Sequence, residues 1–365
     1  MSQALVPSSK EWMSVLSALL LAPPESQVAA DAAARVRNAS REDFAALVAL
    51  ANTNHVIVRS MEIIRRDCER AGDAERAGWA AEALNAEQVR IANALEHLEQ
   101  ICAAFAAENL DVTVMKSLDH WPDLGSDLDL YTNATPLAVC GLMTKSFGAH
   151  IAERSWGDRL ACKWNFEIPG LPEPVEVHVG RLGQTGEQIL LASRLPSRAR
   201  TVEMGGRTFR VPSASDRLMI STLQRMYRHF YFRLCDIVDS AWLATSGLLD
   251  FSELRSSAQA AGIWEGVATY LVIVSDYVRR YRGTDLGLPK FVQESARFGG
   301  ELITFNRDFL RVPIMPQSAS LYRTQLTGLI RKGELHSSAR LGLLPWLATA
   351  AAVGHKLTGS DKGIW

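Results

Sequence analysis

The chain has 365 residues, of which 47% are hydrophobic and 22% charged, and its formal net charge is −1. This length is enough for about two domains with a sizeable core, and the near-neutral charge gives no support for nucleic-acid binding through bulk electrostatics. The 5 cysteines contain no C-x-x-C pair. Their number and spacing argue against a disulfide framework or a zinc cluster and favour a reducing, cytoplasmic location.

The first 110 residues are predicted to form a helical region. Ser8 and Glu11 have the spacing of a capping box at the start of a short amphipathic helix. Between about residues 28 and 109 the chain lacks proline, and Ile91 and Leu95 recur at helical spacing. No membrane span is predicted, because the apolar run near the C-terminus is shorter than about 20 residues and is interrupted by Pro345.

A small α/β core is predicted for residues 111–212. Strands are expected at 112–115 and 127–132, followed by a helix that starts at Thr135 and ends near Gly148. The segments CKWNFEI and PVEVHV alternate like paired strands around a turn rich in proline and glycine. The segment RTFRVP is expected to be a last short strand.

A C-terminal helical domain is predicted for residues 213–310, and residues 311–365 form an extension with weaker signals. Ser213 and Asp216 have capping-box spacing at the start of this domain, and Gly247 is expected to end its first helical stretch. That stretch exceeds about 30 residues, which is long enough for two helices. The fold class is therefore predicted as α+β, with a small mixed-sheet core flanked by N-terminal and C-terminal helical regions.

Acidic side chains share one face on each of two predicted strands. Because the side chains of a strand alternate between its faces, Asp127 and Asp129 point one way and Leu128 the other. Glu176 and His178 share a face in the same manner. Like charges at this spacing repel each other unless a cation lies between them, and divalent ions such as Mg²⁺ take carboxylate oxygens. The pattern predicts a metal site; the alternative is an acidic surface strand.

The order of these segments resembles the polymerase-β-like nucleotidyltransferase superfamily, and most closely the bacterial "uncharacterised nucleotidyltransferase" family. The resemblance covers about residues 35–280 and is carried by Lys116-Ser117, Asp127-Leu128-Asp129, Glu176-Val177-His178 and the segment CDIVD at 235–239. Ser117 stands where glycine is usual in this family, and Glu176 stands where aspartate is usual. Neither departure removes a hydroxyl or a carboxylate.

The resemblance implies that the chain transfers a nucleoside monophosphate from a nucleoside triphosphate to an acceptor, with Mg²⁺ or Mn²⁺ as cofactor and in-line displacement at two metal ions. Asp127 and Asp129 would hold both ions, and Glu176 would hold the acceptor-side ion and could act as base. ATP is the first candidate for the nucleotide, although the sequence does not specify the base. The sequence does not specify the acceptor, which could be a small molecule, a peptide or protein side chain, or an RNA end.

The resemblance also implies a set of nucleotide-binding residues: Lys116, Ser117, Ser126, His178, Arg225, Arg228 and His229. The lysine and the serines would bind the triphosphate, the first histidine would orient the acceptor or a metal-bound water, and the residues of the helix around 224–236 would meet phosphates. In that helix, Tyr227 or Phe230 could stack on the base. The structural alternatives are a solvated lysine, a packed histidine and an amphipathic helix with its arginines in water.

Three other functions compete with this interpretation. The chain could be a catalytically inactive nucleotide-binding or scaffold protein on the same fold, because a fold does not determine a function; the three acids argue against it. A glycosyltransferase also uses Asp-x-Asp with a metal, but it would need Rossmann-like strands before the motif, where this chain is helical. A pure nucleic-acid binder is disfavoured by the net charge.

Overall fold

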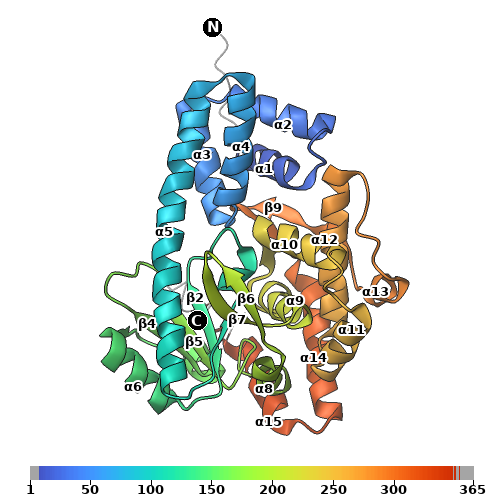
Figure 1. Ribbon diagram of the computed structural model, residues 1–365. Helices are drawn as coiled ribbons and strands as arrows, with labels where there is room; N and C mark the ends of the chain where they lie inside the picture. Colours follow the sequence, from blue (N-terminus) through green and yellow to red (C-terminus); the bar gives the residue numbers. More distant parts are fainter. Residues whose placement is uncertain (1–7, 348, 351–352, 354–365) are drawn as a thin grey trace.

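The computed structural model describes residues 8–347, 349–350 and 353 of the chain. The protein is α+β, as the sequence predicts: a small mixed sheet lies between an N-terminal helical region and a set of C-terminal helices (Figure 1). No helix among these described residues is both long enough and apolar enough to cross a membrane.

The N-terminal region consists of the helices α1 (Ser9–Leu21), α2 (Gln27–Arg37), α3 (Arg41–Thr53), α4 (Ile57–Ala71) and α5 (Ala74–Ala107). The predicted capping box of α1 is confirmed, since Ser8 Oγ accepts a hydrogen bond from the backbone N–H of Glu11 and the Glu11 carboxylate accepts one from the backbone N–H of Ser8. Helix α5, 34 residues long, extends from the N-terminal bundle along the side of the sheet (Figure 1).

The core sheet contains the strands β1 (Thr113–Met115), β2 (Leu128–Thr132), β3 (His150–Ile151), β4 (Lys163–Glu167) and β5 (Val175–Val179), in the spatial order β1-β2-β5-β4-β3. Strands β2 and β5 are parallel, and the other neighbours are antiparallel. Helix α6 (Pro136–Phe147) starts after its cap Thr135 and ends at Gly148, as predicted. The short helix α7 (Trp156–Ala161) precedes β4.

A separate antiparallel hairpin of β6 (Arg200–Met204) and β7 (Arg207–Val211) follows α8 (Ile189–Arg198). The sequence predicts β7 but not β6. The side chains of β6 are either exposed or half-buried. Its sequence therefore does not show the strong alternation of apolar and polar residues that predicts a strand. Its pairing depends on the turn at Gly205 and Gly206, where both residues have positive φ, a conformation that glycine adopts at little cost.

The helical stretch after residue 213 consists of more than one helix, in agreement with its predicted length. Helix α9 (Ala214–Thr222) continues into a π-helical turn, η2 (Leu223–His229), which ends at Phe230 with a φ of 54°. The strand β8 (Tyr231–Phe232) and the helix α10 (Leu234–Thr245) follow. The later elements are α11 (Phe251–Ala260), α12 (Trp264–Arg282), α13 (Lys290–Ser295), η3 (Gly300–Leu302), β9 (Thr304–Asn306), β10 (Phe309–Arg311), η4 (Ile314–Ser318), α14 (Ala319–Arg331) and α15 (Leu335–Gly342).

One buried hydrophobic cluster runs through these regions. It includes Trp12 and Phe105 from the N-terminal helices, Val177 from the sheet, Tyr270 from α12 and Leu321 from α14. The predicted helical region, α/β core and C-terminal helical domain therefore share one core. Helix α14 of the predicted extension also contributes to it.

Candidate functional site

The parallel pairing of β2 and β5 brings three predicted site residues together. Asp129 lies opposite Glu176 in the register of the two strands, and His178 follows on the same face of β5. One ligand atom from each of these side chains lies within 4.8 Å of the other two. The neighbouring Leu130 and Val177 are completely buried in the core, so the alternation of each strand fixes the direction of its acid.

The segment between β1 and β2, which includes the 3-10 turn η1 (Ser117–His120), holds the two aspartates in place. Lys116 has a positive φ of 53° directly after β1. The buried hydroxyl of Ser117 donates a hydrogen bond to the carbonyl oxygen of Asp127 (3.1 Å) and accepts one from the backbone N–H of Asp129 (2.7 Å). Any contact of this hydroxyl with a phosphate would have to compete with these two bonds.

Two lysines pair with the acids. The ammonium group of Lys116 pairs with Asp129 Oδ1 and lies 3.6 Å from Glu176 Oε1. Lys163 Nζ, at the start of β4, lies 2.8 Å from Glu176 Oε2 and 2.8 Å from Asp158 Oδ1. Both lysines therefore offset carboxylate charge inside the site.

Sequence reasoning missed Lys163 and Asp158. Lys163 is the second residue of the segment CKWNFEI and pairs in register with His178 of β5. Pairing the two predicted strands in this register would have placed the ammonium group beside Glu176. Asp158 belongs to α7, and no local pattern in the sequence connects that helix with the sheet.

The two central carboxyl groups differ in their affinity for protons. Burial raises the pKa of Asp129 to about 6, although the ion pair with Lys116 opposes this effect. Burial also acts to raise the pKa of Glu176, but it is outweighed by Lys116 and by the 2.7 Å hydrogen bond with His178 Nε2, which hold that pKa well below its usual range. Neighbouring acids whose pKa values are pushed apart are typical of functional sites.

The donor set suits a divalent cation. Asp127, Asp129, Asp158 and Glu176 bring four carboxyl groups to this region, and the two lysines offset part of their charge. Among the described residues, Asp127 is not in the group of mutually close ligand atoms. Lys116 lies between Asp129 and Glu176, so a cation bound by both of these acids would have to displace its ammonium group.

A cavity of about 530 Å³ lies next to the turn η2. Its lining includes Tyr227, Arg228 and His229 of η2 and the adjacent Phe230, and the helices α14 and α15 contribute further residues. A smaller cavity, which is lined by Lys116 near the acids, shares Arg228 with the larger one. Arg228 and His229, predicted to bind phosphate, and the aromatic rings predicted for the base therefore line a cavity of ligand size. The C-terminal extension supplies another of its walls.

Two of the predicted nucleotide-binding residues lie elsewhere. Arg225 is 1% exposed, and its Nε lies 2.7 Å from Asp236 Oδ2 inside the core. Ser126 is exposed, donates to Asp127 Oδ1 (3.3 Å) and lines a different cavity beside His55. The partner of Arg225 belongs to the CDIVD segment, which the sequence singled out without indicating what it contacts.

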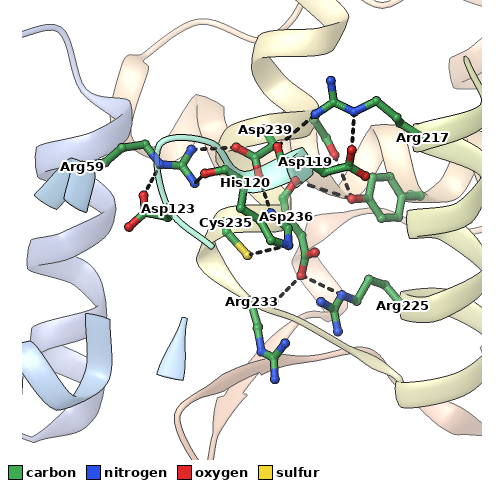
Figure 2. Close-up of polar contacts among 12 residues, drawn as sticks. Arg59, Asp119, His120, Asp123, Arg217, Arg225, Arg233, Cys235, Asp236 and Asp239 are labelled. Atoms are coloured by element: carbon green, nitrogen blue, oxygen red, sulfur yellow. Dashed lines mark hydrogen bonds and ion pairs between the residues drawn. The ribbon is translucent and has the colours of Figure 1, made fainter. Parts of the chain in front are cut away.

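The CDIVD segment is part of a buried polar network (Figure 2). Asp239 accepts a hydrogen bond from Arg59 Nη1 (2.6 Å), and its other oxygen lies 2.6 Å from His120 Nδ1. Arg59 of α4 also pairs with Asp123 at 2.7 Å. The network joins an N-terminal helix, the β1–β2 segment and α10, and sequence reasoning missed Arg59 and His120 because their partners are distant in the chain.

Comparison with known proteins gives no match: no protein-family model, no curated protein and no solved structure is similar to this chain. The family that the site residues indicate therefore stays a prediction.

Proposed function

We propose that this chain is a metal-dependent nucleotidyltransferase, which moves a nucleoside monophosphate from a nucleoside triphosphate to an acceptor. The observation that carries the proposal is the position of Asp129 on β2 opposite Glu176 on the parallel strand β5, with Asp127 two residues earlier in the chain. Carboxylates on adjacent strands suit cation-assisted displacement at phosphorus. A cavity of ligand size shares Arg228 with the smaller cavity that Lys116 and His178 line.

Mg²⁺ or Mn²⁺, when bound, would stabilise charge on the attacking and leaving oxygens. Asp127 and Asp129 would hold the ions, and Glu176 would serve the acceptor side. The low pKa of Glu176 keeps it ionised at neutral pH, which suits a cation ligand better than a proton acceptor. In the reaction, the acceptor oxygen bonds to the α-phosphorus, pyrophosphate leaves and the acceptor proton passes to solvent.

The triphosphate would extend from the acids towards the 530 Å³ cavity. Lys116 would then offset phosphate charge in place of aspartate charge. Arg228, which lines both cavities, would bind phosphate together with His229. Tyr227 and Phe230 offer aromatic rings for the base. ATP is the first candidate for the nucleotide. The acceptor could be a small molecule, a peptide or protein side chain, or an RNA end.

One observation favours a second candidate, a catalytically inactive nucleotide-binding or scaffold protein. Lys116 and Lys163 already pair with the acids, so part of the carboxylate charge is balanced without a metal ion. Ammonium groups that replace a cation in this way would stabilise the fold and leave no strong cation site.

Label transfer separates the two candidates. The protein is incubated with each common nucleoside triphosphate labelled at the α-phosphate, with Mg²⁺ or Mn²⁺ and with an extract that contains small molecules, RNA and proteins. We expect metal-dependent transfer of label to one acceptor, identified by mass spectrometry. Asp129→Asn should abolish the transfer, and Glu167→Gln, which changes an exposed acid on β4, should preserve it.

Nucleotide binding is followed in parallel by thermal unfolding, since a ligand that binds only the native state raises its stability by about 2.7 kcal/mol at 100 times its Kd. Metal-dependent stabilisation by a triphosphate without any label transfer would favour a nucleotide-binding protein that lacks transferase activity. No metal-dependent stabilisation with any triphosphate would contradict the nucleotidyltransferase proposal and favour a scaffold in which the two lysines balance the acids.

A further inference from the structure

We propose that the chain holds a Zn²⁺ ion at a second site, formed by His55, His120 and Cys235, which the nucleotidyltransferase proposal does not use. One ligand atom from each of these side chains lies within 4.8 Å of the other two. The two histidines are each 9% exposed, and the cysteine is completely buried. Imidazole nitrogen and thiolate sulfur are the ligands that Zn²⁺ prefers in proteins.

The spacing of His120 and Cys235 agrees with tetrahedral zinc. Zn–N and Zn–S bonds of about 2.05 and 2.3 Å place the two ligand atoms of a tetrahedral site about 3.6 Å apart. His120 Nε2 and Cys235 Sγ lie 3.8 Å apart (Figure 2). The pair therefore needs to move by only a few tenths of an ångström to share an ion.

The ring of His120 is oriented for this role. Its Nδ1 lies 2.6 Å from Asp239 Oδ2, which leaves Nε2 directed at Cys235 (Figure 2). Asp239 is itself held by Arg59 through its other oxygen. A carboxylate on the far nitrogen of a histidine fixes the tautomer and strengthens the ring as a metal ligand, as in many zinc sites.

The third ligand is the buried His55. Within the described part of the chain, its Nδ1 is buried without a hydrogen-bond partner. Its ring packs edge-on against the ring of His120, with 5.8 Å between the ring centroids. A buried polar atom without a partner destabilises the folded chain, and metal ligation by the ring would account for placing a histidine here.

A fourth ligand can come from solvent. A cavity of about 250 Å³ is lined by His55 together with Asn52, Arg90 and Gly125. Three protein ligands leave one position of a tetrahedral zinc ion open, and water commonly fills it. The cavity gives a water molecule and the entering ion a path to the site.

The ion would join three distant parts of the chain. His55 follows α3, His120 ends the turn η1 after Lys116, and Cys235 lies in the first turn of α10. These separations also explain why cysteine spacing in the sequence predicts no zinc cluster, since no two ligands are close in the chain. A bound ion would hold the segment that carries Lys116 against both helical regions.

The test uses the full chain after treatment with a chelator. Metal content after dialysis against Zn²⁺ should be one ion per chain, measured by mass spectrometry, and the thermal midpoint should rise. Replacing the zinc with Co²⁺ should give a thiolate-to-cobalt charge-transfer absorption. Cys235→Ser should abolish this absorption and weaken zinc binding by more than the roughly 10–100-fold that loss of an outer hydrogen-bond partner costs.

Two variants serve as controls. Glu176→Gln, which alters the acidic site, should keep both zinc binding and the cobalt absorption. A variant in which serine replaces Cys68, Cys102, Cys140 and Cys162 should also keep them, and it gives an answer even if Cys235→Ser does not fold. The proposal is overturned if Co²⁺ gives no thiolate absorption, if the absorption disappears from the four-serine variant, or if zinc binding is lost only with Glu176→Gln.

Discussion

Lys163 is a buried cation that two carboxylates share. Its Nζ lies 2.8 Å from both Glu176 Oε2 and Asp158 Oδ1. Lys163→Met keeps most of the aliphatic chain but leaves both acids without this partner, and breaking a buried ion pair from one side costs about 3–5 kcal/mol. We expect the free energy of unfolding, measured by urea denaturation without divalent ions, to fall by this amount.

The control for this variant is Lys145→Met, which changes an exposed lysine on α6 and should alter stability by less than about 0.5 kcal/mol. Adding Mg²⁺ should recover part of the loss in Lys163→Met, because a divalent cation can replace the missing ammonium group. A loss that Mg²⁺ does not change would argue that these acids serve the fold alone.

Asp129 makes the stability of the metal-free protein depend on pH. Its pKa is about 6 in the folded chain and about 3.9 in an unfolded one. Between these values the native state binds more protons than the unfolded state, so stability falls as the pH rises through this window and then stays constant. The free energy of unfolding of the parent relative to Asp129→Asn should therefore decrease from about pH 4 to about pH 6.

Urea denaturation in the presence of a chelator, repeated across this pH range, measures the difference between the two proteins. An opposite trend, in which the parent gains relative to Asp129→Asn as the pH rises, would mean that Lys116 holds this carboxylate ionised. The electrostatic description of the site would then be wrong.

The contact between α12 and η2 shapes the larger cavity. A Cβ added at Gly266 of α12 would lie 2.6 Å from Tyr227 Cε2 and 2.7 Å from its Cζ, so the tyrosine ring would have to move. Tyr227 is buried and lines the cavity, and overpacking of this kind costs about 1–3 kcal/mol. Gly266→Ala should lower the thermal midpoint and weaken any nucleotide binding.

The matched control is Gly328→Ala on α14, where no heavy atom lies within 4 Å of the added Cβ. This change should raise the free energy of unfolding by about 0.5–1 kcal/mol through helix propensity alone. Equal effects of the two alanines would contradict the role given to Tyr227.

Most elements could be predicted because their signals are local. The cap and end of α6 and the alternation of β5 lie within a few residues of the elements that they mark. The strand β6, whose side chains are exposed or half-buried, lacked such a signal. The same limit applies to the site: strand alternation placed Asp129, Glu176 and His178 correctly on their faces, whereas the pairing of Lys163 with Glu176 depends on strand register, and the burial of Arg225 against Asp236 depends on tertiary packing.

At the scale of the whole molecule, Arg59 connects three regions. It extends from α4 to Asp123 in the β1–β2 segment and to Asp239 in α10. Arg59→Met would leave Asp123 without its cation and Asp239 with only His120 as partner, so we expect a loss of about 3–5 kcal/mol in the free energy of unfolding. Because the regions share one core, Arg59→Met should unfold in a single transition, like the parent, but at a lower midpoint when unfolding is followed by circular dichroism.

Arg65→Met, on the same helix, is the control for this variant. Arg65 pairs with Glu69 four residues later near the surface, and such pairs contribute about 0.3–0.5 kcal/mol. If Arg59→Met cost no more than Arg65→Met, the network would not hold the regions together.

The strands β4 and β5 follow each other in the chain and form an antiparallel hairpin, whereas α6, β3, α7 and β4 separate β2 from β5 in the chain. Hairpins form within about 1–10 μs, and contacts between distant segments form later because closing a longer loop costs more entropy. During folding, Lys163 and Glu176 are therefore expected to meet before Asp129 arrives. When β2 then pairs with β5, Asp129 would approach a Glu176 carboxylate whose charge Lys163 already offsets. The favourable ion pair would therefore form before the two carboxylates repel each other.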